Sequence, residues 1–360
     1  MTPADLSRTV LHAVRRAVDE DALRAPVPAR VRVERSRPGG SGDYACAVAL
    51  QLARPAGLPA LEIARILRER VAAEPGVGRV EITGPGFLSF TLDAPAVGDR
   101  AVLGAVREQG LGYGHGGALG GEIHQLHHAR EVRAAVTAQA VFRLLVAQGA
   151  RGRTTCEQAP DPDWARLGVT VDAYGTPPTP LAEIRPVPAG ATAGELLERL
   201  GPDAARWGLL RAAGHDRAAL GPELLVQGEA NPLFRVRYAH ARARALTRGA
   251  TALGFTADAA PYGESPAPYD EAARPLIDLI ADHPGVLLAA ARHRAPDRVA
   301  RQLEAVAHAF FDFHDSCPSL PAGDEKPSAA HRARLALAEA AGTVLAGGLS
   351  LLGIRAPEHL

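Results

Sequence analysis

Apolar residues recur at helical spacing through almost all of the chain beyond Gly201, and this pattern limits the possible folds more than any other feature. The periodic runs cover residues 204–213, 222–248, 270–293, 297–315 and 329–352. Spacings of three and four residues put such side chains on one side of a helix, which is then buried against other helices. Before the first run, Gly201-Pro202-Asp203 places a proline and an acid in a first helical turn. The pattern predicts a C-terminal helical bundle.

The amino-terminal stretch, residues 1–92, predicts a compact α/β unit. In LPALEIARILRERV, Leu61, Ala64, Leu67 and Val71 have helical spacing, and Pro59 stands near the start, where its missing N–H does no harm. The following GRVEITGPGFLSFTL alternates apolar and polar residues on both sides of a Gly-Pro-Gly turn. We expect two short strands joined by that turn, in a sheet backed by helices.

Three kinds of sequence lie between the two ends. A glycine-dense stretch within residues 94–121 predicts a flexible connector. Residues 123–149 predict one helix that ends at Gly149. Residues 150–194 are rich in proline and glycine, with one strand expected at 167–173, and we expect them to build little core.

These patterns together predict a mostly helical α+β protein in four parts. The parts are an α/β domain at 1–95, a Gly-rich linker at 96–122, a shortened centre at 123–195 and an all-α bundle at 196–360. A length of 360 residues favours two or three domains. Hydrophobic residues make up 47% of the chain, enough for substantial cores, which excludes a disordered binder.

The cysteines and the apolar segments exclude several classes of protein. Cys46, Cys156 and Cys317 lie far apart and form no CxxC pair, so neither a disulfide framework nor a thiolate zinc site is indicated. Charged residues among the first twenty positions exclude an apolar signal core. The most apolar run, residues 341–353, is shorter than the roughly 20 residues that span a bilayer. We expect a cytoplasmic protein with no membrane partner.

A local excess of positive charge lies in NPLFRVRYAHARARALTRGA, residues 231–250, although the chain has a formal net charge of zero. The stretch has no carboxylate and five arginines: Arg235, Arg237, Arg242, Arg244 and Arg248. On a helical wheel, one side is a stripe to be buried, made of Val236, Ala239, Ala243 and Leu246. The opposite side consists of Arg237, His240, Arg244 and Arg248. A third, mildly apolar side consists of Phe234, Tyr238, Ala241 and Ala245.

Two interpretations of this basic helix remain open on the residues alone. Guanidinium groups match phosphate oxygens, and an aromatic or imidazole ring among them can stack on an unpaired base, as in RNA recognition. The alternative is a solvated face with ion pairs. Because residues 231–250 contain no acid, any counter-charge for that face must come from another helix.

The same stretch resembles a known signature. NPLFRVRYAHAR is similar to ENPVYYVQYAHAR of the DALR-type anticodon-binding domain of arginyl-tRNA synthetases. GPDAARWGLLRA at 201–212 resembles the family's GPDAARY, and the final RLALAEAAGTVLAGGLSLLGIRAPEHL resembles its closing helix and last residues. The resemblance implies tRNA as partner and an RNA-binding set here of Asn231, Arg235, Arg237, Tyr238, His240, Arg242, Arg244 and Arg248.

The amino-terminal unit resembles the N-terminal domain of the same family. The similar stretches are GDYACAVALQLARPAGLPALEIARILRERV and GPGFLSFTL. In the family this domain touches the D-loop of the tRNA through an aromatic residue and a nearby amide. Phe87 matches the aromatic position, whereas Ser89 stands where asparagine is usual, so stacking is retained and base-specific hydrogen bonding is not implied. The alternative is that Phe87 packs in the sheet.

The centre departs from the family. An arginyl-tRNA synthetase activates arginine on a class I parallel sheet built from βαβ units of roughly 30 residues or more. Fewer than 80 residues separate Ile123 from Gly201, which we take to be too few for that sheet. His124 and His127 of HQLH stand where the family has HxGH, forming a degenerate ATP motif with Leu126 in place of glycine. The strand and turn that usually precede the motif are expected to be missing.

The second ATP signature of the family, KMSK, also has no match. Its lysines stabilise the charge of the transferring phosphates. The chain has a single lysine, Lys326, in a predicted loop between late helices, and RPVPAG at 185–190 stands where MSKRAG is expected. We therefore expect no catalytic residues, no cofactor and no aminoacyl-adenylate synthesis by this chain alone.

A zinc site is a further reading of the central histidines. His124, His127 and His128, with Glu131 near in sequence, offer imidazoles on adjacent turns of the expected helix. We favour instead an exposed relic helix with surface histidines and expect no metal.

Three functional hypotheses result. The first is a non-catalytic paralogue of arginyl-tRNA synthetase that binds tRNA, most plausibly an arginine tRNA, through its N-terminal and anticodon-binding domains. The second is a protein-interaction or regulatory module that partners a full-length synthetase or another tRNA-using enzyme. The third is an arginine–tRNA ligase with residual activity. The shortened centre also changes the spacing of the two RNA-contacting domains, which decides whether both engage one tRNA.

Overall fold

The computed structural model describes residues 3–36, 42, 44–74, 77–92, 95–175, 177, 181–257 and 271–360. The chain forms two compact units, Met1–Gly104 and Ala105–Leu360. Helix α4 (Pro95–Gln109) contains the boundary between them. Its presence corrects the expectation of a flexible connector over the first half of the glycine-dense stretch.

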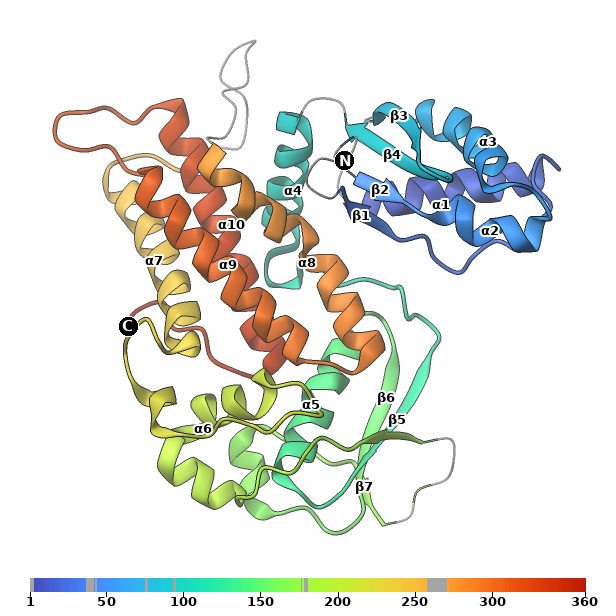
Figure 1. Ribbon diagram of the computed structural model, residues 1–360. Coiled ribbons are helices and arrows are strands. Elements are labelled where there is room, and N and C mark those ends of the chain that lie inside the picture. Colours follow the sequence, from blue (N-terminus) through green and yellow to red (C-terminus); the bar gives the residue numbers. More distant parts are fainter. Residues whose placement is uncertain are drawn as a thin grey trace. The chain divides into compact units, whose positions relative to one another are not determined.

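The first unit is a four-stranded antiparallel sheet with helices, as the sequence predicted (Figure 1). Its elements are α1 (Pro3–Asp19), β1 (Val33–Arg35), β2 (Tyr44–Cys46), α2 (Val48–Ala56), α3 (Ala60–Ala72), β3 (Val77–Thr83) and β4 (Phe87–Leu92), with strand order β1-β2-β4-β3. Pro59 is the N-cap of α3, and Gly84 (φ 53°) and Gly86 (φ 131°) make the predicted turn between β3 and β4. Ile63, Leu67 and Phe90 are fully buried in the core.

The centre of the chain contains a parallel sheet, which corrects two predictions. Its elements are β5 (Ile123–His128), α5 (Val132–Ala147), β6 (Arg151–Cys156), the 3-10 helix η2 (Pro162–Leu167), β7 (Ala173–Tyr174) and β8 (Ala182–Ile184). The strands run parallel in the order β7-β6-β5-β8. Residues 123–128 are therefore a strand and not the start of a helix, and the Pro/Gly-rich region builds a core around Trp164, Leu167 and Ile184.

Long-range pairing explains why the helical prediction failed at β5. Six consecutive residues of β5 pair with β6, and three also pair with β8. At Gly152 a Cβ atom would lie 2.4 Å from the carbonyl oxygen of His124, so the close approach of the two strands depends on that glycine. This ladder overrides the local preference of the sequence.

A buried arginine, Arg133, joins α5 to the bundle. Its guanidinium donates hydrogen bonds to five backbone carbonyls, those of Leu209 (3.0 Å), Val187 (2.8 Å), Asp216 (2.6 Å), Ala212 (3.0 Å) and Ala213 (3.0 Å). Burial lowers the pKa of this side chain. Removing Arg133 would leave several carbonyls in the interior without a donor.

The remainder of the glycine-dense stretch also packs against the second unit. After the 3-10 helix η1 (Gly110–Gly112), the buried Tyr113 donates its hydroxyl hydrogen bond to the carbonyl of Ile280 (3.2 Å). Leu119 is buried, and its N–H bonds to the carbonyl of Gln148 (2.9 Å). The prediction of a flexible connector is wrong here as well, because these contacts hold the segment to α5 and α8.

The predicted C-terminal bundle is confirmed (Figure 1). Its elements are α6 (Ala193–Arg211), η3 (Pro222–Leu225), α7 (Pro232–Ala252), η4 (Glu271–Ala273), α8 (Arg274–His293), α9 (Asp297–Ser316) and α10 (Ala329–Leu352). The helix start predicted at Gly201 (φ 71°) and Pro202 is instead a kink inside α6, which begins earlier at a capping box of Thr192 and Glu195. Helix α7 packs against both α9 and α10. Lys326 lies in the loop between α9 and α10, as expected.

Helix α10 has 24 residues and, by length and composition alone, is apolar enough to cross a membrane. The most apolar run within it, residues 341–353, is shorter than a membrane span, whereas the whole helix is long enough. Within the bundle, 78% of the most apolar window of α10 is buried, which is the environment of a core helix.

Candidate nucleic-acid interface

Asn231 and Pro232 fix the start of α7, the basic helix. The Asn231 side chain accepts hydrogen bonds from the N–H groups of Leu233 (3.1 Å) and Phe234 (3.3 Å). Its amide nitrogen donates to the carbonyls of Leu224 (2.8 Å) and Val226 (2.9 Å). Asn231 is buried and uses its amide within the fold, so its contribution to an RNA site is to cap the helix.

The predicted buried stripe of α7 is present. Val236, Ala239, Ala243 and Leu246 are all buried, and α7 lies against α9 and α10 along this side. The remaining surface of the helix has two flanks. We call them the α9 flank, which holds Arg235, Tyr238 and Arg242, and the C-terminal flank, which holds Arg237, Arg244 and Arg248.

On the α9 flank, an aromatic stack lies among the guanidinium groups. The Tyr238 ring stacks on Phe234 (5.6 Å between centroids, 7° between planes) and on Phe311 of α9 (5.5 Å, 23°). Tyr238 is 43% exposed, so part of the stack is open to solvent. An exposed aromatic ring of this kind can accept a base in a stack.

Both arginines beside the stack bond to imidazole nitrogens. Arg235 donates to Nδ1 of His308 (3.0 Å), and Arg242 donates to Nε2 of His314 (3.1 Å). In the part of the chain that the structure describes, neither forms an ion pair with a carboxylate. Burial, and then the charge of Arg242, lower the pKa of His314. An imidazole nitrogen that accepts a hydrogen bond orients a guanidinium group without cancelling its charge, so both arginines can meet a phosphate.

On the C-terminal flank, carboxylates from other elements neutralise Arg237 and Arg244. Arg237 donates to the carbonyl of Arg355 (3.1 Å) and forms an ion pair with Asp203 of α6, to which Nε of Arg355 also donates (2.9 Å). Arg244 pairs with Glu358 (3.0 Å), and Arg248 donates to the carbonyl of Glu358 (3.4 Å). The expected counter-charges thus come from α6 and the residues after α10.

The Asp203 carboxylate is the centre of this flank. Burial alone would raise its pKa, but Arg237 and Arg355 outweigh burial, and the pKa lies below its usual value. The side chain of Asp203 is 11% exposed and that of Arg237 19%, so both charges are largely removed from water. Arg237 therefore holds α7, α6 and the chain after α10 together.

His240 lies inside the fold, not on the surface. It is buried, and its Nδ1 is 3.0 Å from the carbonyl of Gly342 in α10, to which it donates. Burial, followed by the nearby charge of Arg244, lowers its pKa. The wheel placed His240 on the open side with the arginines. The structure corrects that placement, because α10 and the residues after it cover this part of α7.

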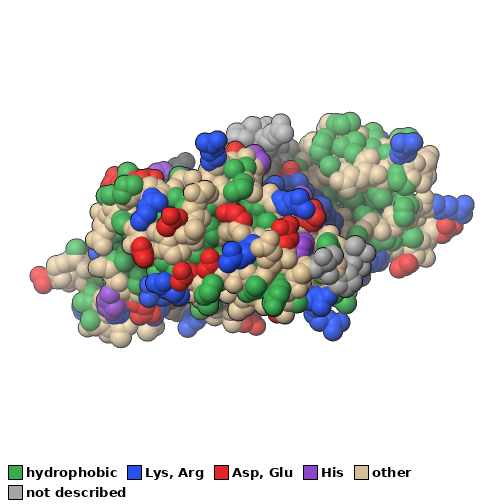
Figure 2. All heavy atoms as spheres, turned by 90° about the horizontal axis from the view of Figure 1, so that it is seen from below, with side chains coloured by type: hydrophobic (Ala, Val, Ile, Leu, Met, Phe, Trp, Pro, Cys, Tyr) green, Lys and Arg blue, Asp and Glu red, His purple; other side chains and the backbone are tan. Residues whose placement is uncertain are grey.

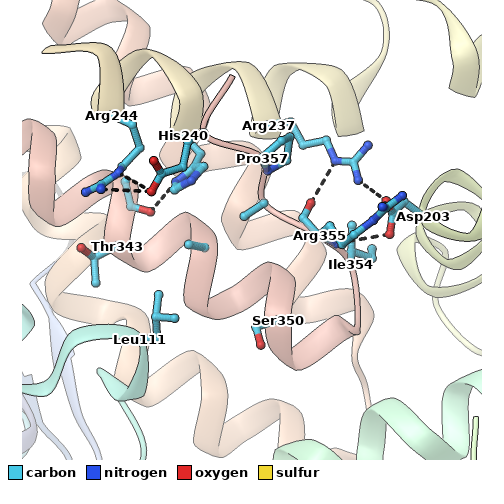
Figure 3. A pocket seen from close by; sticks show the side chains of 14 residues that line it. Leu111, Asp203, Arg237, His240, Arg244, Thr343, Ser350, Ile354, Arg355 and Pro357 are labelled. Carbon is cyan, nitrogen blue, oxygen red and sulfur yellow. Dashed lines mark hydrogen bonds and ion pairs between the residues drawn. The ribbon is translucent and has the colours of Figure 1, made fainter. Parts of the chain in front are cut away.

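A pocket of about 860 Å³ lies between α7, α10 and the residues after α10 (Figure 3). Arg244 and His240 lie at one end, and Asp203, Arg237 and Arg355 at the other. The floor and walls are formed mostly by small or apolar residues: Leu111, Gly342, Thr343, Ala346, Ile354 and Pro357. The volume falls within the range of ligand pockets, about 300–1,000 Å³.

In the first unit, Phe87 and Ser89 differ in accessibility. Phe87 begins β4 directly after the Gly-Pro-Gly turn and is 37% exposed, so it is not confined to the sheet core. Ser89 is buried, and its hydroxyl lies 2.9 Å from that of Thr83. The Ser89 hydroxyl is therefore engaged inside the sheet, while the Phe87 ring is open for stacking.

The central histidines lie on β5. His124 pairs with Glu122 (3.0 Å), His127 bonds through Nδ1 to the hydroxyl of Thr155 (2.9 Å), and His128 donates to the carbonyl of Ala129 (2.9 Å). His127 and His128 are buried, so the interpretation as surface histidines on a relic helix is wrong. On a strand, neighbouring side chains point to opposite faces, so His127 and His128 do not converge on one ion. Glu131 caps α5 instead (2.7 Å to the N–H of Ala134).

Some residues of this surface were missed in the sequence. Phe311 and His314 of α9 complete the α9 flank, and Glu358 completes the other flank. Their partners on α7 are distant in sequence, so a periodic pattern within one helix gives no signal for them. The face shown in Figure 2 mixes basic and acidic side chains, in keeping with the zero net charge.

Models of two protein families match this chain. The arginyl tRNA synthetase N terminal domain matches residues 5–92. The DALR anticodon binding domain matches residues 236–360, which include most of α7 and all of α9 and α10. The chain thus carries two domains of the arginyl-tRNA synthetase family. Tyr238 and Arg242 lie within this second match, and Phe234 and Arg235 lie just before it.

Relatives and solved structures of arginyl-tRNA synthetases agree with this assignment. Proteins named arginine–tRNA ligase from Frankia alni and Renibacterium salmoninarum are each 27% identical, over the whole of both chains. The alignment with the Frankia protein has 560 positions and this chain has 360 residues, so about 200 positions (560 less 360) hold no residue of this chain.

The fold is similar to those of solved arginyl-tRNA synthetases. The Thermus thermophilus enzyme superposes with a TM-score of 0.66 at 15% identity and covers all of both chains. The Plasmodium falciparum enzyme gives 0.64 at 10% identity and covers 99% of each. At these identities the likeness concerns the fold.

Proposed function

We propose that this protein is a non-catalytic arginyl-tRNA synthetase paralogue that binds tRNA, with an arginine tRNA as its preferred ligand. One observation carries the proposal: Tyr238 presents an exposed stacked ring between Arg235 and Arg242, within a DALR anticodon-binding domain. Stacking supplies affinity for an unpaired base, and guanidinium groups supply phosphate contacts. This combination suits a tRNA loop better than a duplex, whose bases are already stacked.

The proposed RNA-binding residues differ in role. Tyr238, Arg235 and Arg242 contact RNA directly. Asn231, Arg237 and His240 act through the fold, because the first caps α7 and the other two attach it to α6, α10 and the residues after α10. Arg244 and Arg248 contribute where Glu358 leaves them exposed, and Phe87 offers a separate stacking position in the N-terminal domain.

The non-catalytic part of the proposal rests on the centre of the chain. Leu126, in the place of the motif glycine, is fully buried within β5, and the single lysine lies between α9 and α10. The parallel sheet has four strands, and about 200 positions (560 less 360) of the Frankia alignment have no counterpart here. The degenerate motif around His124 and His127 is thus part of a strand ladder. We propose that it holds no nucleotide.

The test is a set of titrations by fluorescence anisotropy at near-physiological salt. The ligands are an arginine tRNA transcript, the same transcript with an altered anticodon loop, and an unrelated tRNA. We expect preference for the first and an affinity that falls with salt, because phosphate contacts release counterions. Equal or absent binding to all three contradicts the tRNA assignment. ATP–pyrophosphate exchange dependent on arginine contradicts the non-catalytic assignment and favours residual ligase activity.

A second candidate is a module that binds a full-length synthetase or another tRNA-using enzyme. It is favoured by a second hollow of about 270 Å³ whose lining includes the exposed apolar residues Leu225, Val226 and Leu360. Copurification with a synthetase that survives charge reversal at Arg235 and Arg242, combined with no tRNA binding, favours this candidate. Either function places the protein in the cytoplasm, where translation occurs.

A further inference from the structure

The residues after Ile354 form one wall of the 860 Å³ pocket, and their two halves are held unequally. We call residues 355–360 the closing segment. At its start, Arg355 is fixed by its N–H to Asp203 (3.2 Å), by Nε to Asp203 (2.9 Å) and by its carbonyl to Arg237 (3.1 Å). Beyond Pro357, the contacts are the pair of Glu358 with Arg244 and long hydrogen bonds from Arg248 to the carbonyl of Glu358 (3.4 Å) and to His359 (3.5 Å).

The Glu358 contact is weak enough to be exchanged. The side chains of Arg244 and Glu358 are 45% and 53% exposed, so water screens their attraction. Ion pairs of this exposure contribute little to stability. By contrast, Asp203 and Arg237 are largely buried. The closing segment therefore has a firm attachment at Arg355 and a displaceable one at Glu358.

The pocket beneath the closing segment suits a flat ligand with one negative charge. The α10 residues that line it include Gly342 and Ala346, two small residues that leave room for a flat group. Arg244 lies at one end of the pocket (Figure 3). The Nδ1 of His240 is used on Gly342, so the Nε2 of the neutral ring is an acceptor. A nucleobase offers a flat face and N–H donors, and its phosphate offers the charge that Glu358 supplies in this structure.

We propose that the pocket takes one unpaired RNA nucleotide, whose phosphate replaces the Glu358 carboxylate on Arg244. The closing segment is thus a strap that competes with RNA for the C-terminal flank of α7. This inference rests on the proposed function, since it adds a second nucleotide position to the tRNA surface on the α9 flank. The inference gives Arg244 on the C-terminal flank a phosphate partner, as Arg235 and Arg242 have on the α9 flank, although Glu358 holds Arg244 in this structure.

Two variants test the strap and the pocket separately. Glu358→Gln removes the competing charge, and Glu198→Gln removes one charge from an exposed position of α6 as the matched control. We expect Glu358→Gln to bind the arginine tRNA transcript about threefold to fivefold more tightly, the size of one half-exposed ion pair. The slope of log affinity against log salt should steepen by about 0.7, one single-strand phosphate. Glu198→Gln should change neither quantity.

Ala346→Leu fills the pocket floor and should weaken tRNA binding about tenfold without lowering the Tm, the loss of roughly one stacked base. If Ala346→Leu lowers the Tm, the test uses Ser350→Leu in its place, because Ser350 is at an exposed position of the pocket lining. Unchanged affinity in both Glu358→Gln and the filled variant overturns the inference. If wild type binds tRNA and Tyr238→Ala weakens that binding, while Glu358→Gln and the filled variant leave the affinity unchanged, only the further inference fails and the proposed function stands. If wild type binds no tRNA, the proposed function fails.

Discussion

Arg237 and Arg242 lie on the same helix and both belong to the RNA-binding set that the sequence resemblance implies, yet their surroundings differ in kind. Arg237 meets a largely buried carboxylate, Asp203, that also holds Arg355. Arg242 meets a neutral imidazole, His314, beside an exposed aromatic stack. In the first arrangement a carboxylate inside the fold neutralises the charge of the arginine, and in the second the charge stays available to a ligand. The partner of an arginine, rather than its position on a helical wheel, separates a structural arginine from a binding one.

The largest expected effect is on the C-terminal flank. Asp203→Ala leaves Arg237 largely buried without its counter-charge, which costs about 3–5 kcal/mol of unfolding free energy. Urea denaturation of the purified variant measures the loss. Glu358→Ala serves as the control, since it removes a half-exposed partner. Equal, small losses in both variants would erase the distinction between the buried and exposed ion pairs.

The next effect is on the α9 flank and concerns binding alone. Tyr238→Ala removes the exposed face of the aromatic stack and should lower tRNA affinity by about 1–3 kcal/mol, the value of one base–aromatic stack. Because Tyr238 is 43% exposed, we expect little change in Tm. Anisotropy titration and a thermal melt measure the two quantities. A fall in Tm with unchanged tRNA affinity would show that the stack serves packing.

A smaller, pH-dependent effect is expected at His240. Burial lowers its pKa in the folded protein, so the unfolded chain binds the proton more readily. Its contribution to stability is therefore complete above the ordinary pKa of about 6.5 and is lost as the pH falls below that value. We expect the Tm of wild type to fall by a few degrees between pH 7 and 5, and His240→Gln to lose part of this dependence. Parallel Tm curves for the two proteins would contradict the assignment.

The smallest effect is expected from Arg244. Arg244→Ala breaks only the half-exposed pair with Glu358 and should cost less than about 1 kcal/mol of unfolding free energy. Urea denaturation at low and high salt checks both the size and the screening of this pair. A cost equal to that of Asp203→Ala would mean that the closing segment is fixed along its whole length.

The sequence carried most of the information about the two ends of the chain. The stripe of Val236, Ala239, Ala243 and Leu246 is buried as its spacing required, and the Gly84-Pro85-Gly86 turn joins two strands. These features depend on residues near each other in sequence, so the spacing of apolar residues along a helix or strand indicates them directly. The bundle and the N-terminal sheet could therefore be predicted.

The central sheet could not be predicted from local pattern. β5 consists of IHQLHH, whose strand character depends on pairing with β6 and β8 rather than on alternation. His240 was misplaced for a similar reason, because its burial depends on Gly342, distant in the chain. Contacts between distant segments decide which polar residues are covered, and a single sequence contains no direct signal for them.

The central claim is tested most directly by the salt dependence of tRNA binding in a double variant, Arg235→Glu/Arg242→Glu. Its control is Arg298→Glu, at an exposed position near the start of α9. We predict at least tenfold weaker binding of the arginine tRNA transcript by the double variant, with a slope against log salt shallower by about 1.4, two single-strand phosphates. The control should match wild type. Wild-type affinity and slope in the double variant would contradict the assignment of the α9 flank as the RNA-binding surface.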